Sequence, residues 1–157
     1  MTPLALATVA AVSAWLGIMA FFSFIAAPTL FRSMERGAAA TAAAAVLPGY
    51  YVCGVVLSAV ALVASVARLA KARSTGTALA ATAVLSASML GLGLWSLLVV
   101  LPAAEAARGA RDSTAFALAH RRAVSLNGLA MLCGAAALGV ELVTRRRAGP
   151  SAIPPGA

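Results

Sequence analysis

Four long stretches of this chain carry no Asp, Glu, Lys or Arg, and they constrain the fold more than any other feature. They cover residues 1–31, 37–67, 74–104 and 123–140. A helix that crosses the hydrocarbon core of a bilayer needs about 20 mainly apolar residues. Lipid offers the backbone no hydrogen-bond partner, so a spanning chain forms either helices or a closed barrel. The stretches are continuous and rich in Ala and Leu, which favours helices over the short alternating strands of a barrel.

We therefore predict an all-α integral membrane protein, a four-helix bundle with four transmembrane spans in one domain over residues 1–147. The spans are predicted at about residues 4–27, 47–67, 78–101 and 123–143. The Pro- and Gly-containing C-terminal tail, residues 148–157, is predicted to be disordered.

Prolines and one acidic residue suggest where the helices begin and end. Pro28 and Pro102 are predicted to end the first and third helices, because proline lacks an N–H and its ring clashes with the preceding turn. Pro48 is predicted in the first turn of the second helix, where proline is tolerated. The Ala-rich segment 37–45 is either an arm lying at the membrane interface or the early part of that helix. Asp112 is a candidate cap for a helix that begins outside the membrane and becomes the fourth span.

The net charge of +8 comes from basic residues beside the apolar stretches, where membrane proteins usually hold them. This placement predicts contact with lipid headgroups, and we exclude nucleic acid as a partner. If the N-terminus is cytoplasmic, the inner and outer sides of the membrane hold equal numbers of Lys and Arg. However, the clusters at 68–73 and 145–147 are denser and directly adjoin the spans, which favours both termini in the cytoplasm.

Four local patterns occur in an order that resembles a known family. They are Trp15-Leu16-Gly17 through Phe21-Phe22-Ser23-Phe24 to Ala27-Pro28-Thr29-Leu30-Phe31; Leu47-Pro48-Gly49-Tyr50-Tyr51; Val100-Leu101-Pro102 with Arg108 downstream; and Phe116-x-x-x-His120-Arg121-x-x-x-Ser125-x-Asn127. Over about residues 14–142 the chain resembles the transmembrane protein 205-like family, known in bacteria as domain of unknown function 4149. The resemblance implies a compact four-span membrane protein and no particular reaction. We expect a multi-pass protein of the cell membrane, in the bacterial inner membrane.

The fourth predicted span carries most of the polar chemistry. His120 is the only histidine of the chain. At about 100° per residue, His120 and Asn127 share one helix face, with Arg121 and Ser125 beside it. These four residues form a candidate polar pocket that could hold a ligand headgroup, an ion or a proton. The other interpretation, which we favour, is an interhelical hydrogen-bond clamp with His120 at the membrane interface.

Aromatic residues and prolines supply the candidate packing and interface positions. They are Trp15, Phe22, Pro28, Pro48, Tyr51, Trp95 and Pro102. Trp15 and Phe22 repeat at helical spacing and predict core packing, whereas Tyr50, Tyr51 and Trp95 fit interfacial anchoring. Glu141 lies four residues before Arg145, which is the favourable order for a structural ion pair.

Catalytic signatures are scarce. The sequence contains no Gly-rich phosphate loop, no H-E-x-x-H and no plausible Ser–His–acid set, and no cofactor is predicted. We favour a non-enzymatic bundle that binds membrane lipids or partner proteins, with a second copy of the chain or another membrane protein as the candidate partner. The alternative is a small redox or transport module that holds a metal, haem or quinone near His120 and Asn127.

Overall fold

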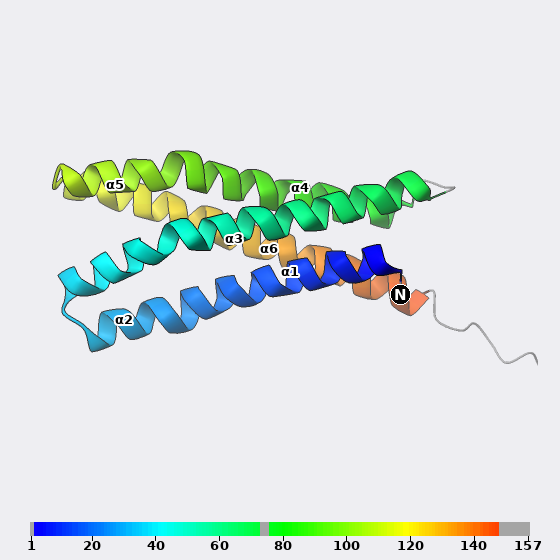
Figure 1. The fold of residues 1–157 in the computed structure, drawn as a ribbon, viewed down its shortest axis with the longest axis horizontal. Coiled ribbons are helices and arrows are strands. Elements are labelled where there is room, and N and C mark those ends of the chain that lie inside the picture. Colours follow the sequence, from blue (N-terminus) through cyan, green and yellow to red (C-terminus); the bar gives the residue numbers. More distant parts are fainter. Residues whose placement is uncertain (1, 73–75, 148–157) are drawn as a thin grey trace, which may run out of the picture.

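The computed structural model of the chain describes residues 2–72 and 76–147, and within them it contains four long helical rods packed side by side (Figure 1). The rods are built from α1 (Pro3–Phe21), the π-helical turn η1 (Phe22–Ala26) and α2 (Ala27–Ser33); α3 (Arg36–Lys71); α4 (Thr77–Trp95), the π-helical turn η2 (Ser96–Val100) and α5 (Leu101–Gly109); and α6 (Ser113–Arg147). The predicted all-α four-helix bundle is confirmed. The predicted disordered tail, 148–157, lies outside the described residues.

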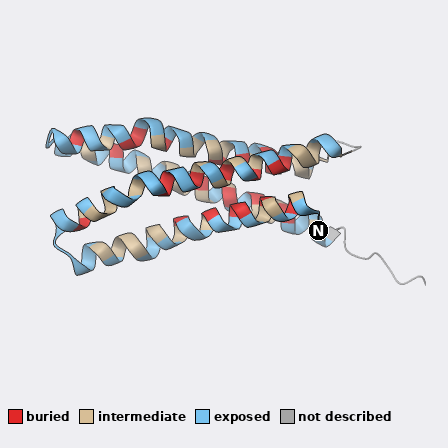
Figure 2. Ribbon diagram, in the orientation of Figure 1, coloured by how far each residue is buried: buried red, intermediate tan, exposed pale blue. Residues whose placement is uncertain are grey.

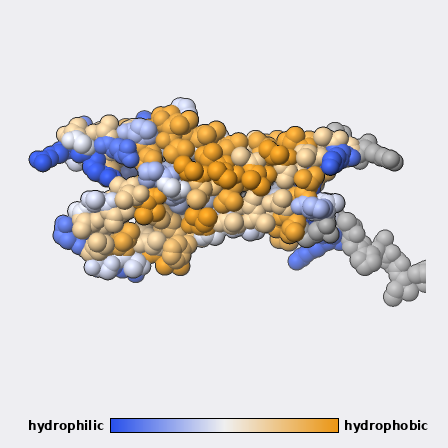
Figure 3. All heavy atoms as spheres, viewed as in Figure 1, coloured by the Kyte–Doolittle hydropathy of each residue, from blue (hydrophilic) through white to orange (hydrophobic). Residues whose placement is uncertain are grey.

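All four rods are long and apolar enough to cross a membrane. They contain 31, 36, 33 and 34 residues, which corresponds to about 45–55 Å at about 1.5 Å per residue. The hydrocarbon core is only about 30 Å thick, so the rods extend beyond it. Figure 3 shows a broad apolar surface over the middle of the bundle and hydrophilic residues at both ends. The chain is therefore a multi-pass membrane protein.

Neither Pro28 nor Pro102 ends its helix, and that prediction is wrong. Each proline is the second residue after a π-helical turn. In the first rod, the N–H of Ala27 donates to the carbonyl of Phe22, five residues earlier, and the third rod has the same arrangement. The wider π-helical turn leaves room for the proline ring. It also accommodates the loss of the backbone hydrogen bond that proline cannot donate, because proline has no N–H. The rods therefore continue into α2 and α5, which carry side chains toward the membrane surface.

The second rod is one unbroken helix. The Glu35 carboxylate caps it by accepting from the N–H of Ala38 at 3.2 Å. Segment 37–45 is the beginning of α3, which excludes a separate interfacial arm. Pro48 consequently lies inside the helix, not in its first turn as predicted. Alanine has the highest helix propensity, so the Ala run extends the helix upstream of the proline.

The first hairpin, α1 to α3, and the second hairpin, α4 to α6, repeat one plan. Pro102 follows Pro28 by 74 residues (28 to 102), and η2 follows η1 by the same interval. Thr82 also follows Thr8 by 74 residues, and each hydroxyl donates to the carbonyl four residues earlier, at 3.1 and 3.0 Å respectively. Both hairpins start at the same end and run in the same direction (Figure 1).

The two ends of the bundle differ in how closely the hairpins lie. The tip end holds the connections at 33–36 and 109–113, and the terminal end holds the start of α1 and the end of α6. Toward the tip end, α2 and the first turns of α3 diverge from α5 and α6 (Figure 1). Figure 2 shows that buried residues concentrate on the inward faces of the rods, away from the tips.

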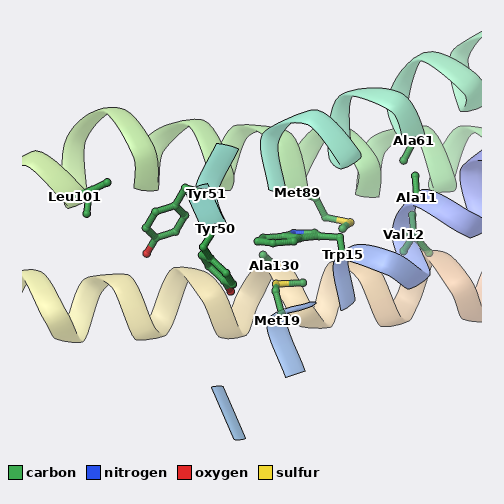
Figure 4. Close-up of a cluster of buried hydrophobic side chains, with 11 residues drawn as sticks. Ala11, Val12, Trp15, Met19, Tyr50, Tyr51, Ala61, Met89, Leu101 and Ala130 are labelled. Carbon is green, nitrogen blue, oxygen red and sulfur yellow. The ribbon is translucent and has the colours of Figure 1, made fainter. Parts of the chain in front are cut away.

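Large side chains fill the middle of the bundle against small ones. Trp15 is 3% exposed and packs with Met19 and Met89 in the core drawn in Figure 4. Gly54 of α3 lies directly against the indole, since a Cβ built there would be 2.4 Å from Trp15 Cζ2. Small residues allow membrane helices to approach closely in this way.

Candidate functional site

A hydrogen-bonded clamp on Asn127 joins three of the four rods. The Tyr50 hydroxyl of α3 donates to Asn127 Oδ1 of α6. The Asn127 amide donates to Ser23 Oγ in η1 at 3.2 Å. The Tyr50 ring is held by Trp15 and Phe22, with both ring-centroid distances at 4.9 Å. The Asn127 amide thus both accepts and donates a hydrogen bond across the bundle, which is the geometry of an interhelical clamp.

A cavity of about 60 Å³ lies between α3, α5 and α6, nearer the tip end than the clamp. Its lining residues are Ala44, Leu47, Tyr51, Val100, Leu101, Ala104, Glu105, Arg108, Phe116, His120 and Ala123. Most of this lining is apolar, and the ionisable groups come from one carboxylate, one guanidinium, one imidazole and one phenol. The α3/α5/α6 cavity therefore combines an apolar wall with a polar wall.

The polar wall is ordered by aromatic contacts. The Arg108 guanidinium lies over the Phe116 ring, with Cζ 5.5 Å from the centroid. On the same helix, Phe116 stacks on His120 with centroids 6.3 Å apart and an interplanar angle of 14°. An aromatic face attracts a guanidinium, so Phe116 holds Arg108 at the cavity. This contact does not use the hydrogen-bond donors of Arg108. The guanidinium keeps its donors for a ligand or water.

The connection between α5 and α6 fixes these side chains relative to each other. Arg111 adopts the left-handed conformation (φ 56°), and the N–H of Asp112 donates to the carbonyl of Ala107 at 2.9 Å. This bond closes α5 in the way helices commonly end. The Asp112 carboxylate then accepts from the N–H groups of Thr114 and Ala115 at 3.0 and 2.9 Å, so it caps α6 as predicted.

The four candidate pocket residues are not gathered into one site. His120 lines the α3/α5/α6 cavity, whereas Asn127 belongs to the clamp about two turns further along α6. Arg121 and Ser125 are exposed on the surface of the bundle. The partners that complete each site were not predicted from the sequence. They are Ser23 and Tyr50 for the clamp and Glu105, Arg108 and Phe116 for the cavity.

The aromatic residues expected at the interface divide into two groups. Trp95 is 57% exposed, as lipid or headgroup contact requires. Tyr50 and Tyr51, in contrast, are both buried and turn inward, with ring centroids 5.2 Å apart, so neither lies at the interface as expected. Figure 4 shows Tyr51 between Tyr50 and Leu101, where it forms part of the cavity wall.

A second polar cluster lies at the terminal end of the bundle. Glu141 has a side chain only 5% exposed, and it accepts two hydrogen bonds from Arg68, at 2.6 and 3.2 Å. The predicted partner Arg145 also contacts Glu141, at 3.9 Å. Arg145 additionally donates to the carbonyl of Ala5 at 3.5 Å. This cluster ties α1, α3 and α6 together and neutralises a buried carboxylate, which is a structural role.

Residue chemistry limits what the cavity can do. Among residues 2–72 and 76–147, no group of three His, Cys, Asp or Glu side chains lies close enough to hold a metal ion. The cavity offers hydrogen-bond donors from Arg108, Tyr51 and His120 and an acceptor from Glu105. This arrangement suits the recognition of a small polar group attached to an apolar body.

Comparison with known proteins supports the family suggested by the sequence patterns. The profile of the domain of unknown function DUF4149 matches residues 10–113. That range covers the first rod from Ala10 onward and the next two rods in full, and it ends where α6 begins. Searches of curated proteins and of solved structures gave no match. Because the matched profile spans more than half of the chain, this protein belongs to the DUF4149 family.

Proposed function

We propose that this protein binds a membrane lipid without catalysing a reaction, and that the lipid headgroup enters the α3/α5/α6 cavity. The observation that carries the proposal is the two-sided lining of this cavity. Apolar residues form most of its wall, and Tyr51, Glu105, Arg108 and His120 form the rest. A lipid presents the same division between chain and headgroup.

The position of the cavity along the rods supports a headgroup site. Glu105 is the first charged residue after the uncharged stretch 74–104, and His120 precedes the uncharged stretch 123–140. The cavity therefore lies where the apolar surface of the third and fourth rods gives way to charged residues. Headgroups occupy this level of a membrane, while acyl chains lie against the apolar surface beyond it.

The same proposal includes an orientation, with both termini in the cytoplasm of a bacterial inner membrane and the cavity at the outer leaflet. Support comes from the dense basic clusters at the terminal end, at 68–73 and 145–147. We expect a reporter that works only in the cytoplasm to be active when it is fused to the C-terminus. A fusion active only in the periplasm would overturn the orientation.

Filling the cavity tests lipid binding directly. Ala104 lines the cavity, and its neighbour Ala103 on α5 is exposed and does not. We expect Ala104→Phe to abolish a lipid adduct seen by native mass spectrometry after extraction in mild detergent, and Ala103→Phe to retain it. If both variants keep the lipid, the α3/α5/α6 cavity is not the site. If the wild type carries no lipid from any extract, the proposed function is wrong.

The same preparation tests the alternative of a redox or transport module. The structure separates His120 from the Asn127 clamp, so these residues offer no single site for a metal, haem or quinone. An absorption band, a stoichiometric metal or an extracted quinone would favour the alternative over lipid binding.

A further inference from the structure

We infer that the lipid held in the α3/α5/α6 cavity carries a terminal phosphate, that is, a phosphate monoester without a further headgroup alcohol. This inference rests on the proposed function and adds the chemical class of the headgroup. The size of the cavity and the hydrogen-bonding groups on its wall carry the argument.

Size limits the headgroup first. The cavity measures about 60 Å³. A water molecule takes up about 30 Å³ of the liquid, so the space between the helices holds only a few heavy atoms. The free oxygen atoms of a phosphate group can enter such a space while the rest of the lipid lies outside it. Choline, ethanolamine or glycerol attached to the phosphate would block one of these oxygen atoms and would have to project out of the cavity.

Hydrogen bonding then selects an anion that can also donate. The residues that line the cavity include the donors Arg108, Tyr51 and His120 and the acceptor Glu105. A planar guanidinium is well matched to phosphate oxygens. A phosphate monoester has a second pKa near 6, so near neutral pH a fraction keeps one P–OH group that can donate to the Glu105 carboxylate. A phosphate diester has no such proton and would repel that carboxylate.

The charges on the wall are free to act on a ligand. Glu105 and Arg108 lie three residues apart on α5, yet among the described residues no ion pair of 4.0 Å or less joins them. Arg108 instead lies over Phe116. The surrounding tip end holds Arg111, Arg121 and Arg122, all exposed, which attract an anionic headgroup toward the cavity.

The test uses the full chain in nanodiscs of neutral phosphatidylcholine, with dioleoyl lipids of one acyl composition as probes. We expect phosphatidic acid to bind at least about tenfold more tightly than phosphatidylglycerol, and phosphatidylethanolamine to bind no better than phosphatidylglycerol. Arg108→Gln should remove that preference, whereas Arg108→Lys, which keeps the charge and loses the planar fork, should retain part of it. Arg121→Gln removes an exposed charge that does not line the cavity and is the matched control; it should keep the wild-type preference.

The outcomes separate the two proposals. Equal binding of phosphatidic acid and phosphatidylglycerol, lost equally in Ala104→Phe, would overturn the terminal-phosphate inference and leave lipid binding intact. Absence of specific binding by every probe would remove both. Inorganic phosphate should compete with phosphatidic acid only weakly, because it lacks the chains that contact the apolar surface. Competition at equal concentration would show that free phosphate is the ligand and would overturn the lipid assignment.

Discussion

The contact between Gly54 and Trp15 makes a sharp prediction about packing. A Cβ at Gly54 would lie 2.4, 2.6 and 2.8 Å from Trp15 Cζ2, Cη2 and Cε2. Real Cβ atoms do not approach so closely, so Gly54→Ala must displace the indole. Trp15 is 3% exposed and rests against Tyr50 at 4.9 Å, which leaves the ring no open space to enter.

The size of the effect follows by comparison with a second glycine of the same helix. Gly49→Ala makes the same chemical change in α3, but a Cβ there has nothing within 4 Å. Both variants gain helix propensity of at most about 1 kcal/mol, and that gain cancels when they are compared. Overpacking a core typically costs about 1–3 kcal/mol. We therefore expect Gly54→Ala to be about 1–3 kcal/mol less stable than Gly49→Ala.

Reversible unfolding in mixed micelles of a mild detergent and SDS, followed by circular dichroism, measures this difference. Shortening the indole provides a second arm, because Trp15→Leu withdraws the ring atoms that the new methyl group meets. In that background, the extra destabilisation from Gly54→Ala should fall below about 1 kcal/mol. Equal stabilities of Gly54→Ala and Gly49→Ala with Trp15 intact would refute the packing described here.

Three further predictions concern polar groups. Asn127→Leu removes two interhelical hydrogen bonds, each worth about 0.6 kcal/mol on average and at most about 1.7 kcal/mol, so a loss of about 1–2 kcal/mol is expected in the same unfolding assay. Glu141→Gln leaves the Arg68 guanidinium without its carboxylate and should cost about 3–5 kcal/mol, whereas exposed Arg146→Gln should change stability by less than about 0.5 kcal/mol; similar losses would contradict a buried ion pair. Backbone N–H groups at the start of α3 hold the pKa of Glu35 below its usual value. Its capping contribution is therefore complete above the unfolded-state pKa and is lost as the pH falls through the lowered one, so the melting temperature should fall slightly more on acidification for the wild type than for Glu35→Gln.

Local sequence information was sufficient for the membrane architecture and insufficient for the prolines. Absence of charge over long stretches is a property of each stretch by itself, and it identified all four spans. The fate of a helix at Pro28 or Pro102 depends on whether neighbouring helices hold the chain on its course through a π-helical turn. The local sequence around a proline does not show which helices will pack beside it, so we expected the helix to end there.

The candidate site was predictable on one helix and hidden across helices. Helical spacing put His120 and Asn127 on one face of the fourth span, and both do point to other rods. The sequence could not pair Asn127 with Tyr50, because these residues are 77 positions apart. The same applies to Arg68 and Glu141, which are 73 positions apart, so the local pair with Arg145 was the one foreseen.

The repeated plan of the two hairpins makes the chain resemble a dimer whose subunits have been joined covalently. The second rod of each hairpin is offset by 77 residues, since α3 begins at Arg36 and α6 at Ser113. At that interval Asn127 is the counterpart of Tyr50, and the two side chains meet across the bundle. At the same interval, Arg145 is the counterpart of Arg68, and both contact the single carboxylate of Glu141. A dimer of identical hairpins would place identical groups in these contacts. Joining the halves lets a phenol face an amide and lets two guanidiniums share one acid.

The sequence difference between the two hairpins also determines where the proposed function places the headgroup site of each chain. The positions in the first hairpin that correspond to His120 and Arg108, at intervals of 77 and 74 residues, are Ala43 and Met34. The first hairpin has apolar side chains at these two positions, and the second hairpin has the basic residues of the polar wall. Under the proposed function, a chain with twofold internal repetition therefore has its headgroup site at the polar wall of the second hairpin, between α3, α5 and α6.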